Sequence, residues 1–274
     1  MDPLPSEFGS ALAATEIERG VFGARVFYFT ETGSTNDLAA VAADRGEAEG
    51  TTFVAGTQTA GRGRLGRVWF SPPGAGLYMS TIVRRRSIAP WITLAGGVAV
   101  AEGIRSATGL PVEIKWPNDV VTFRGGRPAG RSFSEGRKKI AGILAEASSS
   151  PAGVDRVILG IGINLRSAAY PPEVADRATA IEVELGRPVD AGLVLAQVLA
   201  RLNGVLSEVE HAGPPTLFTR WLELAPSATG ERIEWDGPQG VQGGLSAGLA
   251  EDGALVARTP EGLTRIIAGE VRWV

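Results

Sequence analysis

The sequence of 274 residues contains no cysteine and a single histidine. Disulfides, thiol catalysis and structural zinc sites are therefore excluded or nearly so, and a Ser-His-Asp triad would depend on His211. This histidine ends a helical pattern just before Gly213-Pro214-Pro215. That position predicts a surface or helix-end role for His211 rather than a catalytic one.

Strong net charge and long apolar runs are also missing. The 27 Lys and Arg residues against 30 Asp and Glu residues give a net charge of −3, which argues against a general nucleic-acid binder. No apolar run is long enough to predict a membrane span or a signal sequence. With 44% hydrophobic residues, the chain can bury a large core and a small second domain. We therefore expect a cytoplasmic enzyme without DNA or membrane partners.

Glycine and arginine are concentrated in one short segment, residues 61–67, which Trp69 follows. Its glycines are Gly61, Gly63 and Gly66, and its arginines are Arg62, Arg64 and Arg67. Glycine permits positive φ and close backbone approach, and the arginine fork suits phosphate and carboxylate oxygens. The segment therefore predicts a loop that closes over an anion. The glycines also fit G-x-G-x-x-G, but the residues after Trp69 cannot begin the helix that a dinucleotide site requires.

Four further motifs accompany this loop. In chain order they are Ser34-Thr35-Asn36-Asp37, Lys115-Trp116-Pro117-Asn118-Asp119, Lys139-Ile140-Ala141-Gly142-Ile143-Leu144-Ala145-Glu146 and Gly160-Ile161-Gly162-Ile163-Asn164-Leu165. The first predicts a helix with Ser34 as N-cap. Together the five segments closely resemble the biotin protein ligases, also called biotin–acetyl-CoA-carboxylase ligases, from about Phe27 to the C-terminus.

The resemblance implies an enzyme that activates biotin with ATP to biotinyl-5′-AMP. The enzyme then transfers biotin to a lysine of a biotin carboxyl carrier protein domain in a biotin-dependent carboxylase. The chemistry requires positive charge, because the biotin carboxylate and the phosphates of ATP are both anions. Mg²⁺ carried in with ATP would add to that charge. Because the acyl adenylate is hydrolysable, we expect the loop to order over it and exclude water.

Site residues follow from the same resemblance. The expected biotin-binding residues are Ser34, Thr35, Asn36, Gln58, Gly61, Arg62, Lys139, Gly142, Gly160 and Gly162. The expected ATP-binding residues are Arg64, Arg67, Trp69, Asn118, Lys139 and Asn164. Lys139, Arg62 and Arg64 are the expected catalytic residues, and Asp119 is a candidate Mg²⁺ ligand or a turn cap. Trp69 is expected to form a wall for adenine and Trp116 to lie in the core. Arg84-Arg85-Arg86 reads as a solvated strand end that could also meet an acidic partner.

The patterns predict an α+β fold with a mixed sheet and packed helices. Strands are expected at 25–29, 52–57, 77–83, 112–115, 140–147 and 156–163, and helices at 8–19, 34–44, 91–108 and 191–210. The resemblance implies a class II aminoacyl-tRNA synthetase-like catalytic domain over 1–224 and a small SH3-like β-barrel over 225–274. Ser34 comes too early to leave room for a helix-turn-helix domain, so we expect a monofunctional ligase without DNA-binding domain.

One segment departs from the family pattern. Residues 124–138 form an insertion rich in Arg and Gly, of a composition typical of flexible chain. The insertion is either a basic arm that steers an acidic carrier domain or a tolerated surface loop. The insertion also makes Lys138 an alternative to Lys139 as the catalytic lysine, although the alignment with Ile140-Ala141-Gly142 favours Lys139.

Two alternative functions remain open. The first is a lipoate or octanoate ligase or transferase of the same superfamily. The second is a non-catalytic biotin sensor. Such a sensor could lose its ATP-binding residues, but this sequence keeps every one that matches the family. The sequence does not give the oligomeric state, with a homodimer among the options.

Overall fold

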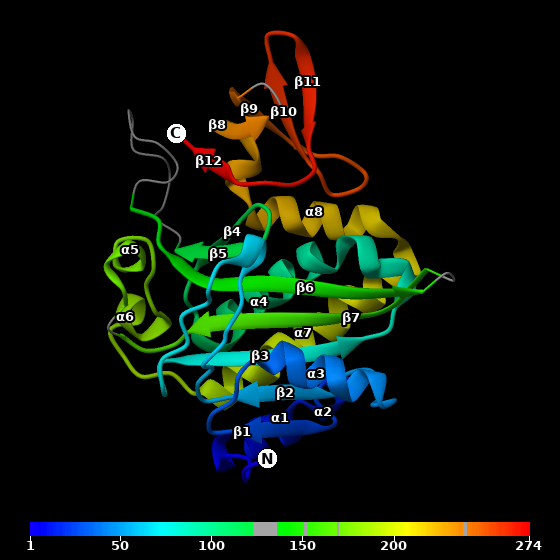
Figure 1. Cartoon of the computed structure of the whole chain (residues 1–274), viewed down its shortest axis with the longest axis vertical. Coiled ribbons are helices and arrows are strands. Elements are labelled where there is room, and N and C mark those ends of the chain that lie inside the picture. The colour runs from blue at the N-terminus through cyan, green and yellow to red at the C-terminus, as the bar shows by residue number, and fades with distance from the viewer. Residues whose placement is uncertain (123–135, 151–152, 169, 238–239) are drawn as a thin grey trace.

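The computed structural model describes residues 1–122, 136–150, 153–168, 170–237 and 240–274. Within these ranges, a seven-stranded mixed sheet forms the centre of the larger part of the chain. A five-stranded sheet built from C-terminal residues lies at one end of it (Figure 1). Helices pack on the large sheet, so the predicted α+β fold is confirmed.

The large sheet carries the site. Its strands in spatial order are β1 (Val26–Phe29), β2 (Thr52–Ala55), β3 (Gly76–Val83), β7 (Gly153–Asn164), β6 (Lys139–Ser150), β5 (Asp119–Thr122) and β4 (Val112–Lys115). Of these strands, β1 and β2 run parallel and each other neighbouring pair is antiparallel. The sequence did not predict β5, because four residues directly after a proline turn are too few to show an alternating pattern.

The two faces of this sheet contact different helices. Successive side chains of a strand point to opposite faces, so Leu159 packs into the main core while Ile158 does not. On the first face, Gly96 of helix α4 (Ile92–Thr108) lies against Leu159. On the second face, Ile158 packs with Ala39 of helix α3 (Thr35–Asp44). In Figure 1, α4 lies behind the sheet and α3 in front of it.

Helices α4 and α7 (Ala191–Ala212) form the core layer behind the sheet, as their apolar patterns predicted. Gly103 of α4 lets the two helices approach closely, since a Cβ there would meet Val198 at 2.7 Å. On length and composition, Arg86–Thr108 and Ala191–Ala212 could each cross a membrane, so the expectation that no apolar run is that long was wrong. In each, more than half of an 18-residue apolar window is buried inside the protein, as in the core helices of soluble proteins.

Several helices differ from the sequence prediction or were absent from it. The helix expected over 8–19 is two helices, α1 (Ser6–Ala14) and α2 (Glu16–Arg19), because Thr15 between them is not helical. Helix α8 (Pro214–Leu224) was not predicted, although proline is well suited to the first helical position. The remaining short helices are η1 (Arg64–Gly66), η2 (Arg86–Trp91), α5 (Pro172–Ala175), α6 (Ile181–Leu185) and η3 (Pro226–Ala228).

The arginines that follow β3 are not a solvated strand end. The Arg85 side chain is 13% exposed and pairs with Glu49 at 3.3 Å and Glu210 at 2.9 Å. The Arg84 guanidinium donates to two backbone carbonyls, and Arg86 pairs with Asp155 at 3.2 Å. The carboxylates that Arg85 and Arg86 meet belong to the same chain. The expectation of a solvated strand end was therefore wrong for Arg84 and Arg85, while Arg86 is exposed.

The C-terminal sheet is antiparallel throughout its described strands. In spatial order these are β11 (Gly262–Ile266), β10 (Leu255–Thr259), β9 (Gly240–Leu249), β8 (Thr229–Gly237) and β12 (Val271–Trp273). A turn at Asp252-Gly253 joins β9 to β10, and Trp116 Nε1 donates to the Gly253 carbonyl at 3.1 Å. Trp116 is buried, as predicted. The small β domain is confirmed, while the division at residues 224 and 225 stays a prediction.

Candidate active site

A cavity of about 170 Å³ opens on the α3 face of the large sheet. Its floor is formed by β6 and β7, and its other walls come from the start of α3, the glycine-arginine loop, the turn between β4 and β5, and residues 269–271. The predicted residues that line it are Ser34, Thr35, Asn36, Gln58, Arg62, Arg64, Arg67, Trp69, Asn118, Asp119, Lys139, Gly142, Gly160 and Gly162. Segments far apart in the sequence thus meet at one site.

Three glycines keep the floor bare. Gly142 faces Gly162 across β6 and β7, and Gly160 is next on the same face. A Cβ on Gly162 would overlap the Trp69 ring, and one on Gly142 would lie 2.7 Å from it. A Cβ on Gly160 would overlap the Asn36 amide. The strand backbone therefore carries no side chains of its own here, and the Trp69 ring lies directly over Gly142 and Gly162.

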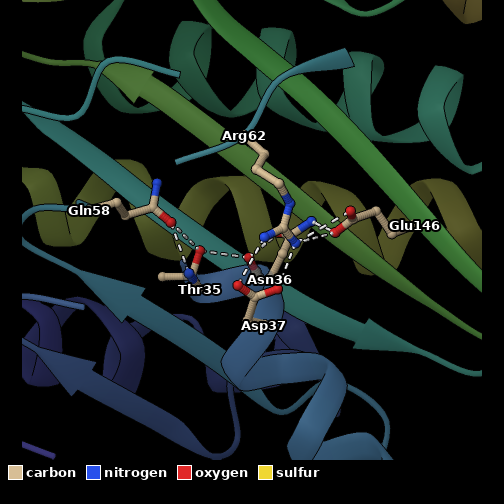
Figure 2. Close-up of polar contacts among 7 residues, drawn as sticks. Thr35, Asn36, Asp37, Gln58, Arg62 and Glu146 are labelled. Atoms are coloured by element: carbon tan, nitrogen blue, oxygen red, sulfur yellow. Dashed lines mark hydrogen bonds and ion pairs between the residues drawn. The ribbon is translucent and has the colours of Figure 1, made fainter. Parts of the chain in front are cut away.

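A hydrogen-bonded polar cluster forms one end of the cavity (Figure 2). Gln58 Oε1 accepts from Thr35 N at 2.8 Å and from Thr35 Oγ1 at 3.0 Å. Ser80 Oγ lies 2.7 Å from Thr35 Oγ1 and donates to Asn36 Oδ1 at 2.5 Å. Ser34 stands at the N-cap position of α3, as predicted, but its side chain makes no capping hydrogen bond. Thr35, Asn36 and Ser34 are all buried, so their polar groups are held in fixed positions.

Arg62 reaches across this polar end from the loop. Its guanidinium lies between the carboxylates of Asp37 and Glu146 (Figure 2), at 2.7 Å and 3.1 Å. The hydrogen bond to Asp37 is the main cause that raises the pKa of Arg62, so the side chain stays charged. Glu146 also accepts from Asn36 Nδ2 at 2.5 Å. Arg62 thus contacts α3 and β6 at once.

Lys139 occupies the opposite end. Its Nζ lies 2.5 Å from Asp119 Oδ1 and 5.1 Å from the centre of the Trp69 ring. Lys115 also lines the cavity, and burial lowers the pKa of its ammonium. Lys138 is absent from the lining that the described residues form, and its backbone N–H donates to Thr122 Oγ1.

The glycine-arginine loop is a tight turn rather than the start of a helix. Trp69 N donates to the Gly61 carbonyl at 3.0 Å and Gly63 N to the Arg67 carbonyl at 2.7 Å. At its tip, Leu65 has φ of 56° and Gly66 of 73°, which ends the single 3₁₀ turn. The rejection of a dinucleotide-binding motif is therefore confirmed.

The other two loop arginines contact the far side of the cavity. Arg64 Nη1 donates to Asn118 Oδ1 at 3.4 Å, and burial lowers the pKa of Arg64. Arg67 pairs with Glu270, which follows the last long hairpin of the C-terminal sheet. The hydrogen bond from Arg67 lowers the pKa of Glu270. The loop thus connects both sheets.

A second cavity, of about 320 Å³, adjoins the first. The two share Arg67, Val68, Trp69, Lys115, Asp119, Lys139 and Glu270. The second is also lined by Phe70 and Tyr170, whose rings meet edge to face at 6.1 Å. The Tyr170 hydroxyl is buried without a hydrogen-bond partner, and burial raises its pKa.

Two predicted site residues lie outside the first cavity. Gly61 contributes its carbonyl to the loop and does not line the space. Asn164 lines the second cavity, where its Nδ2 donates to the Thr179 carbonyl at 3.0 Å. Trp69 forms a wall of both cavities, so it lies over the glycine floor as well as beside the second space. Of the insertion at 124–138, residues 124–135 lie outside the described part of the chain.

Sequence reasoning missed four charged residues of the site: Asp37, Lys115, Glu146 and Glu270. Glu146 shares one face of β6 with Gly142 and Leu144, so the strand period contained a signal for it. No local signal pairs Arg67 with Glu270, which is 203 positions away.

Comparison with known proteins identifies the family. The model of the biotin/lipoate A/B protein ligase family matches residues 27–164. The bifunctional ligase/repressor BirA of Bacillus spizizenii is 32% identical over 269 residues, which cover 95% of this chain and 78% of the relative. A biotin–[acetyl-CoA-carboxylase] ligase of Mycobacterium tuberculosis is 31% identical over 250 residues, covering 88% of this chain and 86% of that protein.

The fold comparison agrees. A biotin protein ligase from Aquifex aeolicus, solved in complex with biotin and ATP, superimposes with a TM-score of 0.75 and 30% identity. The match covers 92% of this chain and all of the other.

Proposed function

The chain belongs to the biotin/lipoate A/B protein ligase family, and we propose on that basis that it activates biotin with ATP and transfers it to a lysine of a biotin carboxyl carrier protein domain. The observation that carries this proposal is the position of Lys139. Its ammonium stands at the boundary shared by the two cavities, between a bare glycine floor and a space with aromatic walls. A cation at such a boundary can contact a carboxylate on one side and a phosphate on the other.

The first cavity suits the biotin ring system. The floor of Gly142, Gly160 and Gly162 can hold a flat bicyclic ring against the strands once the Trp69 ring, which lies over Gly142 and Gly162, moves aside. The ureido group has two donors and one acceptor, and the polar groups of Thr35 and Gln58 can satisfy it. The biotin tail would then run toward Lys139.

In the first half-reaction, an oxygen of the biotin carboxylate attacks the α-phosphorus of ATP. The bond from that phosphorus to the bridging oxygen breaks, and pyrophosphate leaves with the electron pair. Lys139, Lys115 and Arg64 supply positive charge to the reacting anions, and this charge is in place before the reaction begins. Arg67 lines both cavities and adds a further cation.

In the second half-reaction, the neutral amine of the acceptor lysine attacks the acyl carbon of biotinyl-AMP. The bond from that carbon to the phosphate oxygen breaks, AMP leaves, and the new amide nitrogen loses a proton. The glycine-arginine loop covers the cavity and keeps water from the adenylate until the acceptor arrives.

Mg²⁺ is proposed to enter with ATP. Among the residues that the structure describes, no group of three or more His, Asp or Glu side chains is placed to hold a metal ion. A nucleotide-borne Mg²⁺ needs one or two protein carboxylates in addition to phosphates, and Asp119 fits that need. The ion would neutralise phosphate charge. A cytoplasmic location, the absence of a DNA or membrane partner and a homodimer stay predictions.

The decisive test is ATP–pyrophosphate exchange. Purified protein should exchange labelled pyrophosphate into ATP when biotin and Mg²⁺ are added, and should then label a lysine of a carrier domain. Equal exchange with lipoate or octanoate would favour the other branch of the family. No exchange with biotin would overturn the proposal and favour a sensor.

A further inference from the structure

The Arg62 guanidinium is shared by two carboxylates from different parts of the fold. It makes a two-point contact with Asp37 on α3, at 2.7 Å and 2.9 Å, and reaches Glu146 on β6 at 3.1 Å. Glu146 lies four residues beyond Gly142 on the same face of β6, about 13 Å along the strand. Arg62 therefore docks at the far end of the glycine floor from Gly142.

Glu146 is itself fixed by the polar cluster of the cavity. Its Oε2 accepts from Asn36 Nδ2, while Asn36 Oδ1 accepts from Ser80. A continuous path of hydrogen bonds thus runs from Gln58 through the backbone N–H and hydroxyl of Thr35, then Ser80 and Asn36, to Glu146 and Arg62. Figure 2 labels these residues except Ser80. Thr35 and Gln58, which are expected to bind the ureido group, therefore lie on the same path as Glu146, which contacts Arg62 of the loop.

We propose that Glu146 is a positioning residue that docks the glycine-arginine loop through Arg62, with Asp37 as the second carboxylate. This inference rests on the proposed function. It assigns to Arg62, expected from the sequence to be a catalytic and biotin-binding residue, the role of docking the loop that retains biotinyl-AMP rather than that of contacting phosphate. The phosphate charge is left to Lys139, Lys115, Arg64 and Arg67, which line the other end.

The strength of this contact suits a loop that must open and close. The side chains of Arg62, Asp37 and Glu146 are 38%, 61% and 42% exposed. Pairs this exposed are individually weak and are screened by salt. Because Asn36 links Glu146 to the ring site, ligand binding there and loop docking affect each other reciprocally.

The test compares Glu146→Gln and Asp37→Asn with a matched control. Glutamine keeps an oxygen that accepts from Asn36 but loses the charge that attracts Arg62. The control is Asp44→Asn, because Asp44 lies on the same helix, is also 61% exposed and pairs with Arg156 away from the loop. Biotinyl-AMP is formed on the enzyme, and its release is followed by filter binding and by labelling of lysines on a bystander protein.

We expect Glu146→Gln and Asp37→Asn each to speed release of biotinyl-AMP roughly two- to fivefold at low salt, the effect of losing one exposed ion pair. The difference from the parent should shrink as salt rises, and Asp44→Asn should match the parent. Combining Glu146→Gln with Arg62→Gln should add little to Arg62→Gln alone, because both remove the same contact. The proposal would be overturned if Glu146→Gln released biotinyl-AMP at the parental rate. It would also be overturned if the effects of Glu146→Gln and Arg62→Gln multiplied in full in the double variant.

A second measurement needs no ligand. Hydrogen exchange of the peptide covering residues 57–71 should be faster in Glu146→Gln and Asp37→Asn than in the parent and in Asp44→Asn. If the parent makes no adenylate, the proposed function fails while this measurement still decides whether the two carboxylates hold the loop. Equal exchange in all four proteins would refute docking by Glu146.

Discussion

The ammonium of Lys139 lies 2.5 Å from the carboxylate of Asp119, across the pair of strands β5 and β6. Each group therefore satisfies the other. Under the proposed function, an anionic substrate would compete with Asp119 for Lys139, and Asp119 would then be available to a cation that arrives with the nucleotide. The side chain of Lys138, the neighbour, has no comparable place in the cavity lining.

The first prediction concerns this lysine. Lys139→Ala should lower the rate of adenylate formation by roughly 10²-fold or more, because one preorganised positive group is lost where negative charge develops. Lys138→Ala is the matched control and should change the rate little. Single-turnover formation of biotinyl-AMP measures both. A reversed pair of effects would mean that Lys138 is the working residue.

The second prediction concerns the floor of the cavity. Gly160→Ala would place a methyl group where the Asn36 amide lies, and that amide is held on both sides by Ser80 and Glu146. We expect the KM for biotin to rise about tenfold or more, from an overpacking cost of about 1–3 kcal/mol at the ring site. Gly204→Ala on α7 is the control, since nothing lies within 4 Å of a Cβ there. A KM for biotin in Gly160→Ala equal to that of the control would contradict the assignment.

The third prediction concerns the pH dependence of stability. The hydrogen bond from Arg67 lowers the pKa of Glu270 from its ordinary value of 4.5. A carboxyl whose pKa is lower in the folded protein stabilises the fold above pH 4.5, and this stabilisation is lost as pH falls through the folded pKa. Glu270→Gln should therefore lower the Tm at pH 7. Below pH 4.5, the Tm of this variant should fall less steeply with pH than the Tm of the parent. Parallel Tm curves for the two proteins over this range would show that the pair contributes nothing.

The fourth prediction concerns the insertion. Residues 124–139 carry six basic side chains, Arg124, Arg127, Arg131, Arg137, Lys138 and Lys139, against Glu135. Within the described part of this segment, residues 136–139, Lys139 meets Asp119 and Arg137 pairs with the buried Glu113 at 2.7 Å. If the rest steer an acidic carrier domain, deleting 125–136 should slow transfer several-fold at low salt and leave pyrophosphate exchange nearly intact.

The deletion keeps Arg137, so the pair with Glu113 is retained. Transfer by the deletion variant should approach that of the parent as salt rises. Unchanged transfer at low ionic strength would leave a tolerated surface loop as the explanation.

Much of the fold was determined by the sequence itself. Apolar residues at helical spacing or in short runs located six strands of the large sheet and the helices α3, α4 and α7, because each of these elements buries apolar side chains in the core. Short elements without such a period were missed or misjudged, as with β5 and the break between α1 and α2 at Thr15. The motifs also located most of the cavity lining, since those residues stand at the ends and on one face of the predicted elements.

What only the tertiary structure decided is which charges meet. Arg62 pairs with Asp37, 25 positions earlier, and with Glu146, 84 positions later, and Arg67 pairs with Glu270, directly before β12 of the other sheet. These pairings depend on the register between β6 and β7 and on how the C-terminal sheet lies beside the turn after β4. Register and packing arise from burial of the apolar faces over the whole chain, so no local pattern around an arginine specifies which carboxylate it will reach.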